Sequence, residues 1–288
     1  MSRFPDWLSP VALLNAVAGS RKVAETTGIA FGSGNRDRLD VYAPRRARSG
    51  AAPVVVFFYG GGWESGDRAM YRFVGTALAA EGIVTVVPDY RVFPDAHFPA
   101  FVEDGARTVK WVSETIGAFG GDSGKIVLAG HSAGAHIAAM LALDPQWLRG
   151  AGVDARRCLR GLVGLSGPYD FLPLHSAVLE QIFGPEPGRA ASQPINFAGA
   201  GGPAALLITG GRDRVVDPGN TTRLAARLRS AGAEVETITY PRLGHAEVVG
   251  AFGRPLRLLA PVLAETVAFV RRVTAAETAD APALQPAR

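Results

Sequence analysis

The stretch Ile126-Val127-Leu128-Ala129-Gly130-His131-Ser132-Ala133-Gly134 decides the fold. Its first four residues form an apolar run that is typical of a strand buried on both faces. Residues 135–143, rich in Ala, Ile, Met and Leu, favour a helix directly after it. A serine between glycines at such a strand-to-helix turn exposes its hydroxyl at the carboxyl end of a sheet. We therefore expect Ser132 to be a nucleophile, with a plain glycine-rich turn as the alternative.

Working outward, strand-like and helix-like segments alternate along most of the chain. Such alternation predicts an α/β fold with a mainly parallel eight-stranded sheet flanked by helices. The expected strands are two within 23–43 and one each at 53–58, 83–87, 126–129, 162–165, 206–209 and 235–240. The expected helices are 71–81, 101–116, 135–143, 220–231 and a last one from about Pro255 to Thr274.

We expect one domain over residues 1–275, with two segments outside the alternating pattern. Residues 1–22 are predicted to form an N-terminal cap segment. Residues 167–202 are rich in proline and glycine and are predicted to form a small cap inserted between two strands. The Ala- and Pro-rich tail, residues 276–288, is predicted to be disordered.

Composition excludes several classes of protein. The 288 residues carry a formal net charge of only +4, without the concentrated basic stripe that nucleic-acid binding requires. No apolar run has the length of a membrane span, so we expect no stable membrane insertion. The N-terminus does not resemble a signal peptide, and Cys158 is the only cysteine. These features predict a cytoplasmic protein, and its oligomeric state stays open, a homodimer included.

A nucleophilic serine needs a base, and five histidines compete for that role. His245 follows the strand expected at 235–240, which places it at the same edge of the sheet as the serine. His131 is expected to point into the fold and His136 to be a packed or surface residue. His97 and His175 lie in loop or cap segments without an evident partner. We therefore expect His245 to be the base, against an ordinary loop histidine.

The acid that orients this base should follow another strand. Asp213 is the first carboxylate after the strand expected at 206–209. Asp217 is the second choice, although its place before residue 220 suits a helix cap better. The order Ser132, Asp213, His245 is the order of a serine triad on this type of sheet.

A glycine loop, Tyr59-Gly60-Gly61-Gly62-Trp63, follows the strand expected at 53–58. Consecutive glycines let the main chain approach a substrate oxygen closely. With the amide of Ala133, the amides of Gly61 and Gly62 are predicted to form an oxyanion hole. A phosphate-binding loop is excluded, because neither of its glycine patterns is present.

At these residues the chain resembles α/β-hydrolase-fold esterases related to hormone-sensitive lipase, in particular the bacterial feruloyl-esterase-like (BD-FAE-type) branch that includes arylformamidase-like enzymes. The resemblance covers about residues 25–270. It includes the loop, the serine turn, the two triad partners, Asp89-Tyr90-Arg91, Asp104, Phe119-Gly120-Gly121-Asp122 and Ser166-Gly167-Pro168-Tyr169-Asp170. It implies a carboxylic-ester hydrolase with neither metal nor organic cofactor. One departure is Tyr59, where the family usually carries histidine.

Together these features predict a serine carboxylesterase acting on small to medium esters, with a small-molecule ester as its binding partner. Tyr59, Trp63, Phe93, Phe171 and Phe183 are expected to line the substrate pocket, although plain core packing explains the last four at least as well. The alternatives are an amide hydrolase of the kynurenine formamidase kind, a non-catalytic receptor, and an interfacial lipase that uses residues 8–17.

Overall fold

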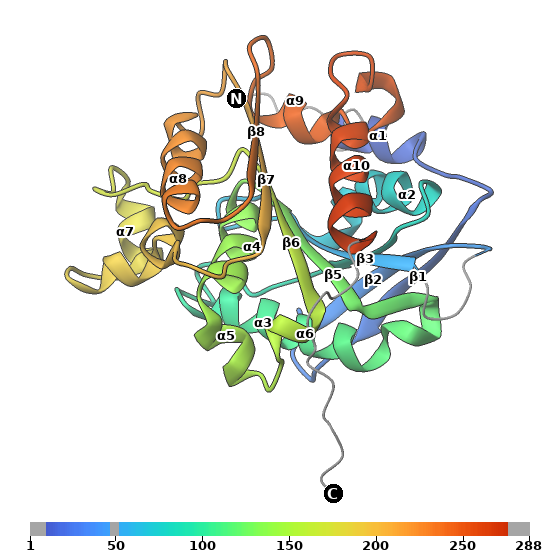
Figure 1. Cartoon of the computed structure of the whole chain (residues 1–288), viewed down its shortest axis with the longest axis horizontal. Coiled ribbons are helices and arrows are strands. Elements are labelled where there is room, and N and C mark those ends of the chain that lie inside the picture. The colour runs from blue at the N-terminus through green and yellow to red at the C-terminus, as the bar shows by residue number, and fades with distance from the viewer. Residues whose placement is uncertain (1–9, 47–51, 276–288) are drawn as a thin grey trace, which may run out of the picture.

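A computed structural model describes residues 10–46 and 52–275 of the protein. Its centre is an eight-stranded sheet with the order β1-β2-β4-β3-β5-β6-β7-β8 (Figure 1). The strands are β1 (Val23–Ala30), β2 (Arg38–Pro44), β3 (Ala52–Phe58), β4 (Val84–Pro88), β5 (Gly121–His131), β6 (Leu159–Leu165), β7 (Ala204–Gly210) and β8 (Val235–Tyr240). Strand β2 is antiparallel to both of its neighbours, and the other pairs are parallel. The predicted α/β-hydrolase fold is therefore confirmed.

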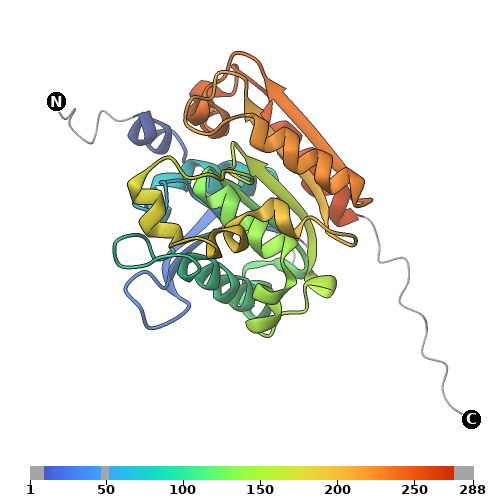
Figure 2. The ribbon, with the colours of Figure 1, turned by 90° about the vertical axis from the view of Figure 1, so that its left-hand side faces the viewer.

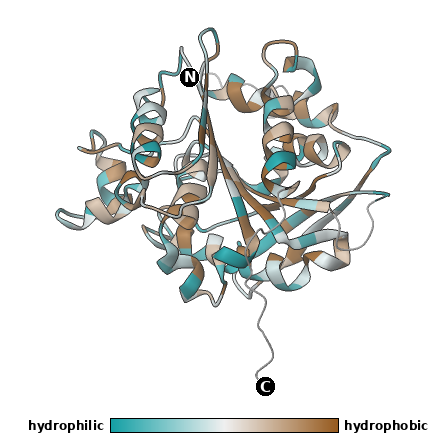
Figure 3. Cartoon of the chain, viewed as in Figure 1, coloured by the Kyte–Doolittle hydropathy of each residue, from teal (hydrophilic) through white to brown (hydrophobic). Residues whose placement is uncertain are grey.

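The central strands are apolar because helices cover both of their faces. Val54, Val55 and Val56 of β3 are completely buried, whereas every residue of β8, at the edge, is partly or fully exposed. Figure 3 shows the hydrophobic residues gathered on the sheet and on the helix sides that face it. Burial of continuous β-branched runs explains why the strands could be located from sequence.

Helices form a layer on each side of the sheet. The α-helices are α1 (Pro10–Ala16), α2 (Arg72–Ala80), α3 (Ala100–Thr115), α4 (Ala133–Leu143), α5 (Pro145–Gly150), α6 (Ala155–Cys158), α7 (Ala177–Phe183), α8 (Gly219–Ser230), α9 (His245–Gly250) and α10 (Val262–Ala275). The 3-10 helices are η2 (Arg68–Tyr71), η3 (Ile116–Phe119), η4 (Gly188–Ser192), η5 (Pro194–Phe197) and η6 (Arg254–Leu256). Helices α2 and α10 lie on one side, and α3, α4 and α8 on the other (Figure 1). None of the described helices is both long and apolar enough to cross a bilayer.

The last helix starts later than the sequence suggested. The prediction of a helix from Pro255 was wrong, because α10 begins at Val262 and only the short η6 precedes it. Pro261 opposes a helix that would run through it from Pro255, because its ring clashes with the preceding turn and it has no amide hydrogen to donate, and α10 begins directly after it. Between η6 and α10, Leu258 is almost fully exposed.

The segment 167–202 holds only short helices: α7, η4 and η5. Figure 2 shows α7, in yellow, on the outside of the molecule. The predicted disordered tail, residues 276–288, lies outside the described residues. The same is true of residues 1–9 of the expected N-terminal cap segment.

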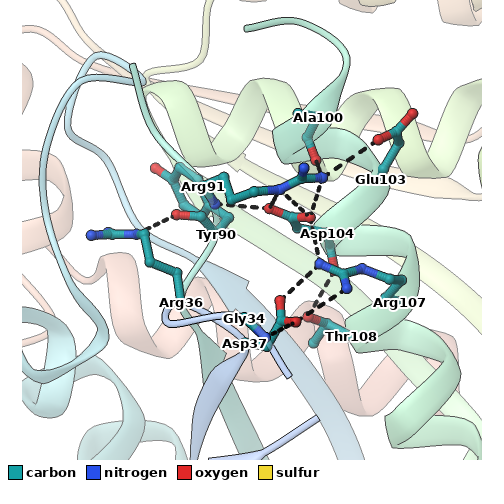
Figure 4. A network of polar contacts seen from close by, with 10 residues as sticks. All are labelled: Gly34, Arg36, Asp37, Tyr90, Arg91, Ala100, Glu103, Asp104, Arg107 and Thr108. Carbon is teal, nitrogen blue, oxygen red and sulfur yellow. Dashed lines mark hydrogen bonds and ion pairs between the residues drawn. The ribbon is translucent and has the colours of Figure 1, made fainter. Parts of the chain in front are cut away.

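A network of ion pairs fixes the loop that follows β4 (Figure 4). Asp104 on α3 is almost fully buried and accepts from Nε of Arg91 at 2.9 Å and from Nη2 of Arg107 at 2.7 Å. Arg107 also reaches Asp37, before β2, at 2.8 Å. A buried carboxylate held by two guanidinium groups ties this loop to α3 and to the start of β2.

Candidate active site

Ser132 stands at the sharp turn between β5 and α4. Its backbone has φ 54° and ψ −122°, a conformation that few non-glycine residues adopt. The flanking glycines make room for this turn. A Cβ on Gly134 would lie 2.1 Å from the carbonyl oxygen of Phe58, and one on Gly130 would lie 2.3 Å from the carbonyl carbon of Gly134. The turn therefore requires glycine at both positions.

Asp213 and His245 meet at the carboxyl ends of β7 and β8. The Nδ1 of His245 lies 2.7 Å from Oδ2 of Asp213. The other carboxylate oxygen accepts from the amides of Val215 and Val216, both at 2.9 Å. Burial opposes ionisation of Asp213, but the hydrogen bonds from Val216, His245 and Val215 outweigh it and lower the pKa of the carboxyl group. Asp213 is therefore an ionised partner for the imidazole.

The structure corrects the local setting of His245, which the sequence placed in a loop. His245 is the first residue of the six-residue helix α9. Gly244 precedes this helix in an extended conformation, so the chain turns into α9 immediately after it. The helix was missed because a stretch this short lacks a periodic apolar pattern.

Ser132 and His245 lie at the same rim of the sheet but are not hydrogen-bonded to each other. In the part of the chain that the structure describes, the Ser132 hydroxyl makes no hydrogen bond. The adjacent residue, His131, has its ring centroid 4.7 Å from that of His245. Catalytic hydrogen bonds are often long without substrate and tighten in the complex, so this geometry is compatible with proton transfer.

The glycine loop presents free amides next to Ser132. Gly61 and Gly62 have φ values of 157° and 63°, and the carbonyl of Gly61 accepts from the amides of Glu64 and Ser65, each at 3.1 Å. Within residues 10–46 and 52–275, the amides of Gly61 and Gly62 donate no hydrogen bond. Ala133 is the first residue of α4, where an amide has no partner within its own helix. Among the described residues, these three amides therefore have no hydrogen-bond acceptor.

A cavity of about 500 Å³ opens above Ser132. Four segments enclose it: the glycine loop, the serine turn, the start of the 167–202 segment and the segment after Asp213. Its lining residues are Gly62, Trp63, Glu64, Ser132, Pro168, Asp170, Phe171, Leu172, Pro173, His175, Leu179, Val215, Val216, Asp217, Asn220 and Arg223. Most of the wall is apolar, and the charged side chains in it are those of Glu64, Asp170, Asp217 and Arg223. A small apolar molecule with one polar group fits such a site.

Two of the five expected pocket residues, Trp63 and Phe171, line this cavity, and their rings stack at 5.9 Å. Phe183 lies behind Trp63, with the two ring centroids 4.9 Å apart, and does not reach the cavity. Phe93 packs against His97 at 5.5 Å, also away from the cavity. Phe93 and Phe183 therefore do not line the cavity.

The expectation that Tyr59 contacts substrate needs correction. Tyr59 is fully buried, and its hydroxyl accepts from Nη2 of Arg36 at 2.7 Å and donates to Asp89 at 3.1 Å. Its ring stacks on Tyr90 at 4.5 Å. Burial raises the pKa of the Tyr59 phenol above its usual range, so the group stays neutral. The phenol anchors the glycine loop from behind, because it forms these hydrogen bonds away from the cavity.

Of the remaining histidines, His131 and His136 are buried, and His97 and His175 are exposed. His136 is fully buried, and its Nε2 donates to the carbonyl of Ser192 at 2.7 Å. Burial lowers the pKa of His136 to about 4. His131 is buried, as expected, but its contact with His245 has no signal in the sequence. His175 is exposed on the cavity rim. Asp217, the second choice for the acid, accepts from the first amide of α8, that of Gly219, at 3.0 Å.

Comparisons with known proteins identify the family. The BD-FAE family model matches residues 39–228. A probable isoprenylcysteine alpha-carbonyl methylesterase (ICME) of Oryza sativa subsp. japonica is 31% identical, over 93% of this chain and 68% of the relative. Esterase LipC of Mycobacterium tuberculosis is 30% identical, over 78% of this chain and 60% of the relative. The chain thus spans only about two thirds of the length of these relatives.

A solved structure shares the fold. Phosphonate-inhibited esterase B from Lactobacillus rhamnosis superposes with a TM-score of 0.79, covering 92% of each chain, at 19% identity. In the described residues of this chain, no three His, Cys, Asp or Glu side chains are grouped so that they could hold a metal ion. The sequence match, the sheet order and the serine turn lead to one conclusion: this chain belongs to the BD-FAE family, an esterase family of the α/β-hydrolase fold.

Proposed function

We propose that the protein is a serine carboxylesterase in which Ser132 is the nucleophile, His245 the base and Asp213 the group that orients the base. The observation that carries this proposal is the 2.7 Å hydrogen bond between Asp213 and His245, beside a serine in strained geometry. A carboxylate at Nδ1 leaves Nε2 of the imidazole free to accept a proton. The relatives named as esterases support the same reaction.

The first half-reaction forms an acyl-enzyme. The Ser132 oxygen attacks the ester carbonyl while its proton moves to Nε2 of His245. The tetrahedral intermediate then collapses, the bond to the alcohol oxygen breaks, and the same proton passes from His245 to the leaving alcohol. Asp213 stabilises the imidazolium without taking its proton. In the second half-reaction, water replaces the alcohol and the acid is released.

Negative charge develops on the substrate oxygen in both half-reactions. The amides of Gly61, Gly62 and Ala133 are the proposed donors to this oxygen. The turn in which the Gly61 carbonyl accepts from the amides of Glu64 and Ser65 leaves the Gly61 and Gly62 amides without an acceptor among the described residues. A single donor of this kind is worth about 3–4 kcal/mol at the transition state.

The cavity favours small to medium esters. At about 500 Å³ it is in the range of small-molecule sites, and Trp63 and Phe171 give it an apolar wall. We propose that this wall holds the acyl or alcohol chain, with residues 167–202 acting as a cap. Because Cys158 is buried and unpaired, we place the protein in a reducing compartment such as the cytoplasm.

The alternative function is an amide hydrolase of the kynurenine formamidase kind, which would use the same groups. A substrate panel separates the two functions: p-nitrophenyl esters from acetate to palmitate, assayed beside N-formylkynurenine. The proposal expects the highest kcat/KM on short and medium esters. It also expects Ser132→Ala to lower kcat on the best ester by about 10⁶-fold. Higher kcat/KM on the formamide would favour the alternative, and an active Ser132→Ala variant would refute both.

A further inference from the structure

A chain of hydrogen bonds joins the glycine loop to the segment that carries His245. The amide of Gly60 lies 3.2 Å from the hydroxyl of Tyr71, which in turn lies 3.2 Å from Nδ1 of His131. The other ring nitrogen of His131, Nε2, lies 3.1 Å from the main-chain carbonyl oxygen of His245. Segments that are far apart in the sequence are connected in this way through two buried side chains.

The chemistry of the end groups fixes the direction of every bond in this chain. The amide of Gly60 only donates, so the Tyr71 oxygen accepts from it and its own hydrogen is left for Nδ1 of His131. The carbonyl of His245 only accepts, so the proton of the His131 ring must be on Nε2. A neutral imidazole satisfies both of these neighbours, because it has one acceptor and one donor nitrogen. A charged imidazole would lose the bond from Tyr71.

Both side chains keep the required protonation state near neutral pH. Burial, followed by the nearby imidazole of His245, lowers the pKa of His131 to about 3. Burial raises the pKa of Tyr71 to about 12. The hydrogen-bond chain therefore keeps one direction throughout the range in which an esterase works.

We propose that Tyr71 and His131 are positioning residues, which hold the glycine loop and His245 at a fixed separation on either side of Ser132. Gly60, His131 and Ser132 are packed closely against one another. A Cβ on Gly60 would lie 2.8 Å from Nδ1 of His131 and 3.1 Å from Cβ of Ser132. This inference rests on the proposed function, because it assigns the two residues to the same reaction.

The reaction needs such a link because two charges form at once. As Ser132 attacks, negative charge grows beside the loop amides while His245 becomes an imidazolium. A displacement of about 1 Å between reacting groups can cost about 10²-fold in rate. His131 hydrogen-bonds to the main-chain carbonyl of His245 and to neither nitrogen of its ring, so it sets position without taking part in proton transfer. Its neutral ring also avoids placing a second positive charge next to the imidazolium.

Tyr71→Phe tests the link by removing only the central hydroxyl. The matched control is Tyr42→Phe, which removes the same atom from another buried tyrosine, on β2, where the hydroxyl lies 3.4 Å from Asp40. We expect Tyr71→Phe to lower kcat on p-nitrophenyl butyrate about tenfold with KM within about twofold, the size of one lost hydrogen bond. The control should keep the kcat of the wild type even if its melting temperature falls equally.

His131 provides a second, independent readout. His131→Leu removes both bonds, whereas the amide of His131→Gln can donate to His245 and accept from Tyr71. We expect the leucine variant to lose at least tenfold in kcat, the glutamine variant to recover most of this loss, and Tyr71→Phe combined with His131→Leu to lose no more than His131→Leu alone. If Tyr71→Phe does not fold, the difference in kcat between His131→Leu and His131→Gln tests the inference.

Two results would overturn the inference while leaving the proposed function intact. One is a folded Tyr71→Phe or His131→Leu variant with the kcat of the wild type, when Ser132→Ala is inactive. The other is a double variant whose loss is the product of the two single losses. An active Ser132→Ala variant would instead refute the proposed function itself.

Discussion

Oδ2 of Asp213 lies 2.7 Å from Nδ1 of His245, although 32 residues separate the two in the chain. The parallel strands β7 and β8 bring them together, because each residue follows the carboxyl end of its strand. The second carboxylate oxygen is held by two main-chain amides, so the aspartate has little freedom to turn away. This pair is already joined in the structure, and Ser132 lies at the same rim of the sheet without a hydrogen bond to it.

The aspartate is expected to be essential for turnover. Asp213→Asn keeps the shape of the side chain but removes the charge that stabilises the imidazolium, and it favours the wrong tautomer of His245. We expect kcat to fall by about 10⁴-fold, measured on p-nitrophenyl butyrate. Asp217→Asn is the matched comparison, since this residue caps α8, and its loss should be about tenfold or less. Equal losses in the two variants would contradict the assignment of Asp213.

The glycines of the serine turn are expected to be needed for folding. Gly134→Ala places a methyl group 2.1 Å from the main-chain oxygen of Phe58, so the sheet or α4 must move. We expect the free energy of unfolding in urea to fall by about 3 kcal/mol. Gly150→Ala, where an added Cβ meets nothing within 4 Å, should be close to neutral. Two equally stable variants would contradict the packing described for the turn.

Stability is expected to fall in mild acid because two buried histidines are neutral in the folded protein. Their pKa values are lowered to about 3 for His131 and about 4 for His136, whereas an unfolded histidine titrates near 6.5. Between these values the unfolded chain binds more protons, so the free energy of unfolding decreases as the pH falls from about 6.5 towards 4.

Urea unfolding at pH 7 and pH 5 measures this decrease. His136→Gln removes one of the two groups while its amide can still donate to Ser192. The variant should therefore lose less stability than the wild type between the two pH values. A decrease of the same size in both proteins would show that His136 is not the source.

Selectivity for chain length is expected to depend on Phe171. Phe171→Ala enlarges the apolar end of the cavity, so kcat/KM for p-nitrophenyl octanoate should rise relative to that for the acetate. Phe93→Ala removes the same ring from a residue outside the cavity and should leave this ratio unchanged. A ratio that shifts equally in both variants would mean that the apolar wall has been misidentified.

Most of the fold could be predicted from the sequence because buried parallel strands are continuous apolar runs. Strand β8 agrees with its prediction at both ends, and β3, β4 and β7 differ only at their ends. The late start of α10 does not show in the apolar pattern, because apolar residues run from Pro255 across Pro261 into the helix. The short helix that begins at His245 is below the length at which periodicity is informative.

The sequence predicts those parts of the site that depend on the order of the residues in the chain and on their place after the ends of strands. The meeting of Asp213 with His245 follows from those two features. The direction of the Tyr59 side chain does not, because it depends on Arg36 and Asp89, which only the folded chain brings to the phenol. The link through Tyr71 depends in the same way on contacts between distant segments, and no spacing in the sequence indicates it.

Esterase activity depends, in the proposed mechanism, on Ser132 being a nucleophile that His245 activates. Treatment with a p-nitrophenyl phosphonate, followed by mass spectrometry of the digested protein, tests it most directly. We predict one phosphonyl group per chain, on the peptide that carries Ser132, and no adduct in the Ser132→Ala variant. We also predict that His245→Ala forms the adduct far more slowly. An adduct on another residue, or equally fast labelling of His245→Ala, would contradict this mechanism.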